Sequence, residues 1–466
     1  MNRISFSILL LLALLAGCTL MPKYERPAAP VSESWPANAT GAAATNTAAA
    51  DIDWHEFFDD PRLQKLIALA LENNRDLRIA ALRVEQARAQ YRIQRADLYP
   101  GIQGEADYTK QRFSGAVTTF GGGSIFTTYS LDVSAAYEID LFGRVRSLKK
   151  EALEKYFSTE EARKSAQIAL VSEVATEYLT QLRLREAKAV ANQTLVAVQA
   201  SYDLIKHRFD AGAASELDLR TAEGQVQAVR VNAASFLQML AESENALVLL
   251  VGRPLPPDLP AGKPFQQQSL LEDLPAGVPS EMLQRRPDIL AAEHTLKAAN
   301  ADIGAARAAF FPRIILTGAG GTASAKLTDL FTGPSVTWSF APQITVPIFE
   351  MGSTRGKLAV SKIARQIEIA DYEKAIQTAF SEVANALATR SILDEKLKAQ
   401  ELLVNAAQKR FDLTTARYNQ GVDSYVDVLL AQQDLYAAQQ NLLAFQAARL
   451  LNAVTLYRSL GGGWKS

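Results

Sequence analysis

The sequence predicts an α+β membrane protein in which two internal repeats each supply two long strands and three helices. Three observations predict this fold class. Segments near residues 130 and 340 alternate between apolar and polar side chains over about thirteen residues, which is longer than most globular strands. A stretch of roughly 64 residues, from 145 to 208, contains neither proline nor glycine. Breaks rich in Gly, Ser, Asp and Pro recur at a spacing of about 210 residues.

The composition argues against several classes of protein. Of 466 residues, 48% are hydrophobic, and 49 basic residues are balanced by 50 acidic ones. Without a basic excess to meet phosphates, the sequence does not predict nucleic-acid binding. One cysteine cannot form an intrachain disulfide, and three histidines cannot build a histidine-rich metal site. No internal run approaches the ~20 apolar residues of a membrane-spanning helix.

The first residues predict export and lipid attachment. Arg3 precedes the apolar segment 4–16, which at about 13 residues is too short to span a bilayer and is typical of a signal peptide covering 1–17. The Leu-Ala-Gly-Cys string that ends at Cys18 resembles the bacterial lipoprotein box, whose cysteine becomes a lipid anchor. Thr19 follows it, which resembles outer-membrane sorting. A plain signal peptide with a chance cysteine is the alternative.

Matched residues on either side of a proline-rich connector define the two repeats. Early in each repeat the matches are Asp76 with Asp288, Ala80 with Ala292, Ala87 with Ala299, Ala89 with Ala301, Ala96 with Ala308, and Pro100 with Pro312. Late in each repeat they are Arg208 with Arg417, Gly212 with Gly421, Ser215 with Ser424, Asp218 with Asp427, and Ala222 with Ala431. Chance repetition among alanine-rich helices is the alternative, but it does not explain the matched breaks.

The predicted organisation follows from these matches. Residues 19–50 lack periodicity and are expected to be an extended tether. The units are a lipidated tether with an equatorial segment (18–60), a first repeat (61–250) with a β-hairpin at 101–142, a connector (251–279), a second repeat (280–460) with a β-hairpin at 313–350, and a tail (461–466).

The two most regular strands each have one apolar face. The first apolar series is Tyr129, Leu131, Val133, Ala135, Tyr137, Ile139 and Leu141, and the second is Val336, Trp338, Phe340, Pro342, Ile344, Val346 and Ile348. Partner strands are expected at 102–112 and 313–323. Such alternation is typical of a transmembrane barrel, with a soluble sandwich as the alternative. Because four strands cannot close a barrel and open edges in hydrocarbon are costly, the sequence predicts an obligate homo-oligomer.

Long helices are expected to continue from these strands. A helix over 145–208 would be about 95 Å long. The other expected helices cover 62–98, 215–250, 280–310, 353–418 and 424–459. Heptad seams that require facing helices comprise Ile168, Val171, Ala175, Tyr178 and Leu182 and, near the C-terminus, Val426, Leu429, Gln433, Tyr436, Gln440, Leu443, Ala447, Leu450, Val454 and Tyr457. The alternative, a fibrous coiled coil, does not explain the strand pairs.

Two helical turns farthest along the chain from the strands form the candidate tip. Gly212 and Gly421 suit helix C-termini with positive φ. Ser215 and Ser424 suit N-caps, and the capping-box acids three residues later are Asp218 and Asp427. These turn and cap roles alone can account for the presence of the residues. Several copies around one axis would also place these carboxylates in a ring that favours cations.

The opening and closing segments carry a resemblance to a known family. The opening residues are Asp53-Trp54, Phe57-Phe58, Asp60, Leu63, Leu66, Ala70, Asn74, Asp76 and Ala80. They resemble TolC-like outer-membrane efflux proteins, and the lipobox, Pro22–Pro27 and Leu460–Trp464 are similar to the OprM-like lipoprotein branch. The resemblance implies a trimer with a 12-stranded barrel continuous with a periplasmic helical barrel. It also implies a periplasmic adaptor, an inner-membrane transporter, and drugs, other small toxic compounds or metal ions as substrates.

The same resemblance implies a constriction on the first turns of the last helix. OprM-like relatives have a leucine ring and an aspartate ring there, and the aligned positions are Val426 and Leu430, with the acid at Asp427. Tyr418 matches a tyrosine beside this gate, whereas Asn419 stands where relatives often carry arginine. The expected adaptor-contact residues are Gly212, Ser215, Asp218, Gly421 and Ser424.

Other functions have weaker support. Gly318–Ala323 loosely fits a dinucleotide loop but lies on an expected strand. No catalytic constellation occurs and the histidines stand apart, so neither an enzyme nor a cofactor other than the lipid on Cys18 is predicted. The alternatives to a drug-efflux duct are a protein-secretion duct, a metal-ion efflux duct, and a structural lipoprotein that conducts nothing.

Overall fold

The computed structural model describes residues 19–36, 49–114, 124–270, 274, 279 and 285–464. The predicted signal peptide and Cys18 lie outside the described residues. The chain divides into two compact units, each described here by itself. The sheet unit comprises Met1–Ala28, Arg83–Glu160 and Ala291–Glu373, and the hairpin unit comprises Ala29–Leu82, Glu161–Leu290 and Lys374–Ser466.

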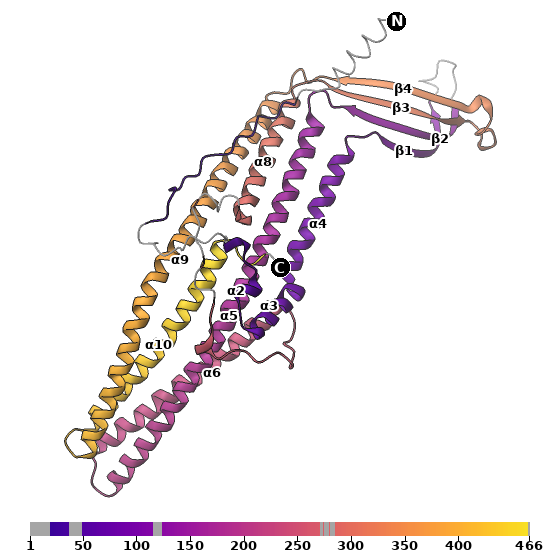
Figure 1. Cartoon of the computed structure of the whole chain (residues 1–466). Helices are drawn as coiled ribbons and strands as arrows, with labels where there is room; N and C mark the ends of the chain where they lie inside the picture. The colour runs from indigo at the N-terminus through magenta and orange to yellow at the C-terminus, as the bar shows by residue number, and fades with distance from the viewer. Residues whose placement is uncertain are drawn as a thin grey trace. The chain divides into compact units, whose positions relative to one another are not determined.

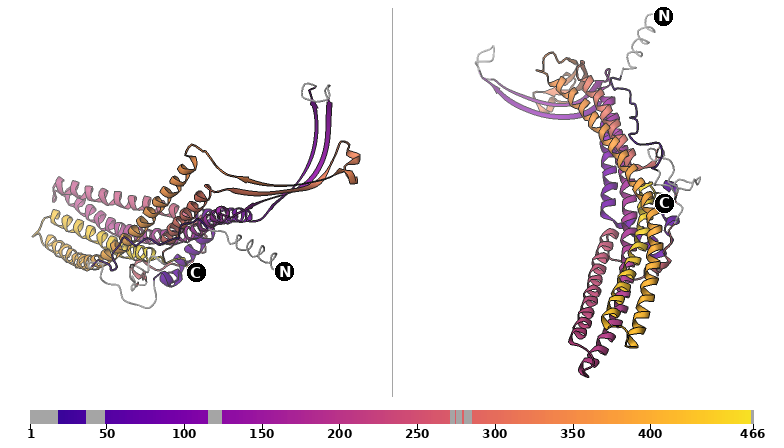
Figure 2. Two further views of the ribbon diagram at one scale, coloured as in Figure 1. Left: turned by 90° about the horizontal axis from the view of Figure 1, so that it is seen from above. Right: turned by 90° about the vertical axis from the view of Figure 1, so that its left-hand side faces the viewer.

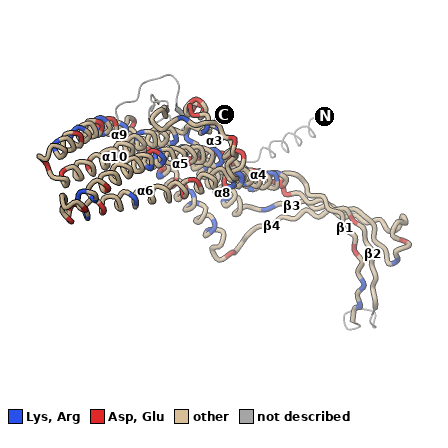
Figure 3. Tube along the Cα trace, turned by 90° about the horizontal axis from the view of Figure 1, so that it is seen from below, with Lys and Arg blue, Asp and Glu red and all other residues tan. Residues whose placement is uncertain are grey.

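The sheet unit contains one four-stranded antiparallel sheet with the order β1-β2-β3-β4 (Figure 1). Its strands are β1 (Gly101–Phe113), β2 (Ser124–Ile139), β3 (Arg313–Ser324) and β4 (Val336–Thr345). The registers pair Gly101 with Ala136, Ile139 with Ile314, and Arg313 with Thr345. Among the residues that the structure describes, β1 and β4 each pair along one edge only. β4 carries no charged residue, and its trace is uniformly tan in Figure 3.

The four expected strands are confirmed, although two of them end earlier than predicted. β2 stops at Ile139 rather than Leu141, because the Asp140 carboxylate turns to accept the backbone N–H groups of Val145 and Arg146 at 3.0 and 2.9 Å. β4 stops at Thr345 rather than Ile348, because Pro347 has no N–H for a ladder bond.

The helices of the sheet unit run from the ends of the strands. They are α4 (Arg75–Ala96) from Arg83 onward, α5 (Arg144–Asp210) up to Glu160, α8 (Pro287–Ala308) from Ala291, and α9 (Ser353–Asn419) up to Glu373. Helix α8 packs on α5 through the side chains of His294 and Glu154 (Nδ1 to Oε2, 2.6 Å) and of Thr295 and Ser158 (2.9 Å between hydroxyls). At the strand ends, Phe142 stacks on Phe311 with ring centroids 4.6 Å apart.

The expected tether is extended but is held along α8. Residues 19–36 form no helix or strand, whereas Ala49–Asp51 is a short 3₁₀ helix, η2, so the predicted extended segment ends before residue 50. Arg26 donates to the Glu293 carboxylate at 2.8 and 3.0 Å, and Tyr24 donates at 3.1 Å. Although burial opposes ionisation, the hydrogen bonds from Arg26 and Lys297 keep the pKa of Glu293 below its ordinary value. The segment is therefore anchored by a charged clamp.

The hairpin unit is built from two long helical hairpins. Helix α5 lies beside α6 (Glu216–Val251), and α9 lies beside α10 (Tyr425–Ser459), in every view (Figure 1 and Figure 2). Smaller helices, α2 (Trp54–Phe57), α3 (Pro61–Asn73) and η3 (Phe265–Gln267), complete the unit. Its main core is aromatic where α2 meets α10, because Phe57 stacks on Tyr457 with ring centroids 4.1 Å apart.

One expected helix is two. The segment 62–98 breaks at Asn74, so α3 ends at Asn73 and α4 begins at Arg75. The Asn74 side chain accepts the Leu77 N–H at 2.9 Å and donates to the Leu250 carbonyl at 2.8 Å. An asparagine that caps the following helix in this way interrupts a continuous helix. Of the expected helix over 280–310, the part described as α8 begins at Pro287 and ends at Ala308, and residues 280–284 lie outside the described residues.

The predicted seams differ in outcome. All five seam residues of α5 are buried, which confirms that seam. In α10, the predicted seam residues Leu429, Leu443, Ala447, Val454 and Tyr457 are buried, but Gln433 is exposed. Apart from Leu429, the first half of α10 buries a neighbouring line made of Tyr425, Val428, Gln432, Leu435 and Ala438. A straight helix drifts against a strict heptad pattern, so a seam assigned from one end loses register at the other.

Helix α6 is long and apolar enough to cross a membrane by length and composition, and it is the one such helix among the described residues. It contains no uninterrupted run of ~20 apolar residues, because charged residues such as Arg230 and Glu242 interrupt it, so the sequence expectation about such runs is not contradicted. Its apolar residues have another use, because Ala222, Val226, Val229, Leu240 and Leu247 are buried within the hairpin unit. Packing of one face accounts for part of the apolar content.

The connector is fastened to the helices by one buried carboxylate. Asp60 is 1% exposed and caps α3, where its Oδ1 accepts the Arg62 N–H at 2.8 Å. Its Oδ2 accepts the Tyr178 hydroxyl at 2.9 Å, the Lys263 N–H at 2.9 Å and the Gln268 amide at 2.6 Å. Burial and the adjacent Asp60 charge raise the pKa of Tyr178. Asp60 thus joins α3, α5 and the connector.

Replacing this carboxylate should destabilise the hairpin unit. Asp60→Ala leaves several buried donors unpaired and is expected to lower the free energy of unfolding by about 3 kcal/mol. Tyr178→Phe removes one donor only and should cost about 1 kcal/mol. Urea denaturation of the detergent-solubilised protein, followed by circular dichroism, measures both. A loss for Asp60→Ala no larger than that for Tyr178→Phe would contradict the assignment.

Candidate functional site at the helical hairpin tips

The two turns of the hairpin unit are built alike. Gly212 ends α5 with φ 73°, and Gly421 ends α9 with φ 77°. The carbonyl of Arg208 accepts the Ala213 N–H at 2.7 Å, and the carbonyl of Arg417 accepts the Val422 N–H at 3.0 Å. Both turns therefore close with the same left-handed glycine and the same long-range backbone bond, as the sequence predicts.

Each following helix begins with a capping box. The Ser215 hydroxyl accepts the Asp218 N–H at 3.1 Å, and the Asp218 carboxylate accepts the Ser215 N–H at 3.2 Å. The corresponding distances for Ser424 and Asp427 are 3.3 and 3.2 Å. The predicted caps are thus confirmed. The role of these residues in pore selectivity or adaptor contact stays a prediction.

An apolar cluster joins the two hairpins below the turns. Its buried members are Ile205 of α5, Ala222 of α6, and Tyr425, Val428 and Leu429 of α10. Tyr202, Leu219, Phe411 and Tyr418 pack against it. Burial raises the pKa of Tyr425 to about 12, so its hydroxyl stays neutral at physiological pH. The cluster holds the first turns of α6 and α10 at fixed positions on the hairpins.

A polar contact between the hairpins was missed from the sequence. The Arg208 guanidinium donates to the Tyr418 hydroxyl and lies 5.4 Å from the centre of its ring. A cation held against an aromatic face and hydrogen-bonded at its edge links the end of α5 to the end of α9. The repeat gave a signal, since Arg208 matches Arg417, but it did not indicate that Tyr418 was the partner.

The matching arginine of the second hairpin makes a different contact. Arg417 binds the Asp423 carboxylate in a bidentate ion pair, with both N–O distances 2.8 Å. The hydrogen bond from Arg417 holds the pKa of Asp423 below its ordinary value. At the position that corresponds to Asp423, the first hairpin has Ala214. Arg208 therefore has no acid in its own turn and reaches across to Tyr418.

The predicted gate residues do not form one cluster within the chain. Tyr418 is half-buried and lies beside Tyr425, with ring centroids 5.6 Å apart. Val426 is half-buried, Asp427 is exposed, and the Leu430 side chain is 47% exposed. One chain thus brings Tyr418 to Arg208 but leaves Asp427 and Leu430 at its surface.

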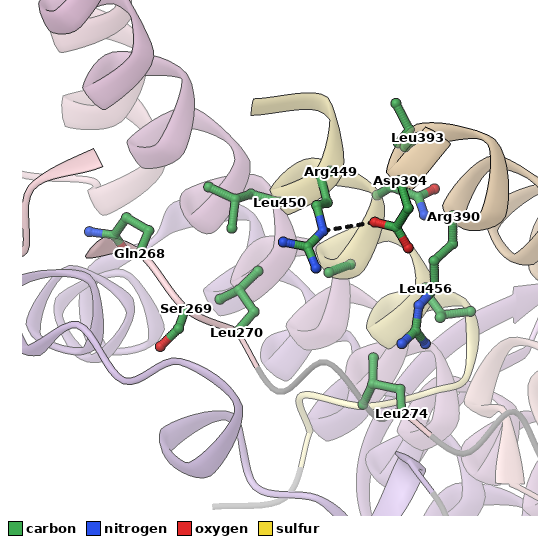
Figure 4. Close-up of a pocket in the computed structure, with 12 residues that line it drawn as sticks. Gln268, Ser269, Leu270, Leu274, Arg390, Leu393, Asp394, Arg449, Leu450 and Leu456 are labelled. Carbon is green, nitrogen blue, oxygen red and sulfur yellow. Dashed lines mark hydrogen bonds and ion pairs between the residues drawn. The ribbon is translucent and has the colours of Figure 1, made fainter. Parts of the chain in front are cut away.

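A hollow in the hairpin unit lies where the connector meets α9 and α10 (Figure 4). Leu270, Leu450 and Leu456 form part of its apolar wall, and the Arg449 guanidinium donates to the Asp394 carboxylate at 3.1 Å. The ion pair occupies the polar side of the hollow. Among the described residues, no group of three or more His, Cys, Asp or Glu side chains is arranged to hold a metal ion.

Comparison with known proteins gives consistent matches. The family model described as "Outer membrane efflux protein" matches residues 66–253 and 278–462. The toluene efflux pump outer membrane protein TtgC and the antibiotic efflux pump outer membrane protein ArpC, both of Pseudomonas putida, are each 45% identical over all of this chain and 96% of their own length. The open state of the Neisseria gonorrhoeae MtrE outer membrane channel matches with a TM-score of 0.88 and 40% identity, over 96% of this chain and 99% of that one.

The Arg417–Asp423 pair predicts an acid-sensitive turn. Because the pKa of Asp423 in the folded chain lies below its ordinary 3.8, the pair stabilises the turn above that pH and is lost as the pH falls through the lowered value. A spin label at exposed Val422 should become more mobile as the pH falls below the ordinary 3.8 of an aspartate. In the Asp423→Asn variant, the same label should be mobile at every pH. A label equally mobile in both proteins at pH 7 would contradict the assignment.

Proposed function

Because the chain belongs to the outer membrane efflux protein family, we propose that three copies of it form the exit duct of a tripartite efflux pump. The chain is an outer membrane efflux channel protein, as its resemblance to TolC-like proteins implied. In the proposed assembly, a periplasmic adaptor and an inner-membrane transporter deliver the substrate, and the transporter supplies the energy. The duct itself needs no cofactor.

The sheet is the observation that carries the proposed oligomer. It has four strands, and in the described part of the chain β1 and β4 each have one edge without a partner. Side chains such as Ile102, Val133, Trp338 and Phe340 are 58–81% exposed on it. In hydrocarbon each unpaired backbone group costs several kcal/mol, so the edges must be paired by other copies. Three copies give twelve strands, which exceeds the minimum of about eight for a closed membrane barrel.

Element lengths support the proposed division into two repeats. Helices α5 and α9 both have 67 residues, α4 and α8 both have 22, and α6 and α10 have 36 and 35. The proposed boundaries of 61–250 and 280–460 contain these elements, except that α6 ends one residue later, at Val251. A barrel of three such chains would surround its axis with six similar units, which suits a tube of uniform wall.

The proposed substrates are drugs and other small toxic compounds. TtgC is named for toluene efflux and ArpC for antibiotic efflux, and both are similar to this chain over its whole length. The proposed anchor is a lipid on Cys18. The contacts of the segment from Leu20 to Arg26 with α8 support this proposal, because a segment held along α8 would keep a lipid on Cys18 close to the protein.

The hairpin tips are the proposed periplasmic end. Gly212, Ser215, Asp218, Gly421 and Ser424 lie in or beside the two turns, where an adaptor could reach them. We assign the gate to Tyr418, Val426, Asp427 and Leu430. The Arg208–Tyr418 contact supports a closed resting tip, since it ties one hairpin to the other.

A deletion strain tests the proposed function. In the bacterium that carries this gene, its loss should raise the accumulation of a lipophilic fluorescent dye and lower the inhibitory concentration of lipophilic antibiotics at least fourfold. The full-length gene should restore both. Unchanged accumulation and susceptibility would contradict an efflux role.

Asp427 should contribute to ion selectivity. Asp427→Asn keeps an oxygen that can accept the cap N–H but removes one charge per copy, so it should lower the preference for cations over anions by about twofold or more in planar bilayers. The matched control is Glu395→Gln, which removes a charge from an exposed site of α9 away from the tip. Equal selectivity in Asp427→Asn and wild type would remove Asp427 from the gate.

A further inference from the structure

A row of arginines on α4 is exposed beside the sheet. Arg88, Arg92 and Arg95 are spaced by four and three residues, so they lie along one face of the helix and form a basic stripe. All three residues are exposed, and no hydrogen bond or ion pair between described residues involves them. Like charges at this spacing repel one another, so an anion that lies between the guanidinium groups would stabilise the stripe.

The equivalent face of α8 is covered by the N-terminal segment. Helices α4 and α8 both have 22 residues, and the repeat that matches Pro100 with Pro312 also matches Arg88 with Asn300, Arg92 with Gly304, and Arg95 with Arg307. On α8 the Asn300 amide donates to the Pro22 carbonyl at 2.8 Å, and Arg307 donates to the Leu20 carbonyl at 3.1 Å. The face that is bare on α4 is therefore the face that carries the N-terminal segment on α8.

The basic stripe lacks the features that hold this segment on α8. A Cβ atom at Gly304 would lie 3.0 Å from the Met21 Cα, so the segment needs a glycine there. The matching residue of α4 is Arg92, whose side chain would fill the space through which Met21 runs. Glu293, which binds Arg26, is matched on α4 by Ala81. A cation and a methyl group thus replace the gap and the acid, which favours a small anion over a peptide segment.

The N-terminal segment also indicates which way this face points in the proposed duct. Cys18 precedes Leu20 by two residues, and acyl chains on it have to reach the bilayer around the barrel rather than the lumen. The face of α8 that carries the segment then points outward. Each helix is followed directly by a strand, β1 after α4 and β3 after α8. The basic stripe therefore also points outward, with Arg95 at the level of Arg307.

We propose that Arg88, Arg92 and Arg95 bind the phosphate headgroups of anionic phospholipids in the periplasmic leaflet of the outer membrane. A guanidinium group can bind two phosphate oxygens at once, and each arginine near an anionic lipid surface strengthens the attraction. The seven residues from Arg88 to Arg95 span about 10 Å of helix, and long arginine side chains can turn toward the headgroups. The site rests on the proposed barrel and anchor, which set the side and the level of the membrane.

Lipid titration of the full-length protein tests the site. Native mass spectrometry counts the lipids bound to the detergent-purified protein, and the probes are phosphatidylglycerol and phosphatidylcholine with the same acyl chains. In the triple variant with Arg88→Gln, Arg92→Gln and Arg95→Gln, the dissociation constant for phosphatidylglycerol should rise about tenfold or more, and that for phosphatidylcholine should stay within about twofold. An unchanged constant for phosphatidylglycerol would overturn the site.

Matched controls separate the stripe from general electrostatics. A variant with Lys396→Gln, Lys398→Gln and Lys409→Gln removes the same charge from exposed positions of α9 and should bind phosphatidylglycerol like the wild type. An equal loss in this control would assign the effect to net charge and overturn the site. Inorganic phosphate at the same phosphate concentration should not displace the lipid. Displacement would assign the stripe to a free anion and overturn the membrane role.

Conductance in planar bilayers separates the lipid site from the proposed duct. The triple variant should conduct like the wild type, because the stripe lies outside the pore. Arg95→Gln alone should weaken phosphatidylglycerol binding about threefold or more, which gives a second test if the triple variant does not assemble. If the wild type conducts but binds both lipids equally, the lipid site is overturned and the duct stands. If the wild type does not conduct, the duct is overturned as well.

Discussion

The unpaired edges of β1 and β4 are the constraint on which the rest of the structure depends. Water satisfies the N–H and C=O groups of a sheet edge in a soluble protein, but hydrocarbon cannot. A chain that places four apolar-faced strands in an outer membrane must therefore find its fifth strand on another molecule. The helices follow from this, because β2 leads into α5 and β4 leads into α9, each through a short connection. In the proposed oligomer, a wall that is shared among copies in the membrane would then be shared below it too.

The two halves of the chain differ in the contacts that their matching arginines make at the tips. Arg208 and Arg417 hold matching places, yet one contacts Tyr418 and the other Asp423. The difference comes from the turn residue at Ala214 and Asp423, which decides whether the arginine is satisfied locally. Where the halves agree, as in the glycine turns and capping boxes, the residues shape the backbone. Where they differ, Arg417 is paired within its own turn and Arg208 connects one hairpin to the other.

Local signals in the sequence predicted much of the fold, because caps, turns and strand alternation depend on near neighbours. Gly212, Ser215 and Asp218 are assigned correctly for that reason. The Asn74 break was missed because the hydrogen bond that fixes it, to the Leu250 carbonyl, joins residues 176 positions apart. The same applies to Asp60, whose partners Tyr178 and Gln268 come from distant segments. The Arg208–Tyr418 contact was missed because sequence spacing carries no information on which hairpins meet.

The clamp between the N-terminal segment and α8 has a geometric consequence for insertion depth. The Leu20 carbonyl accepts a hydrogen bond from Arg307 at 3.1 Å, so the segment is already fixed two residues after Cys18. Two residues of extended chain reach at most about 7 Å. Acyl chains on Cys18 would then hold the last turn of α8 within that distance of the lipid headgroups. The anchor would thereby fix how deeply the protein sits in the membrane.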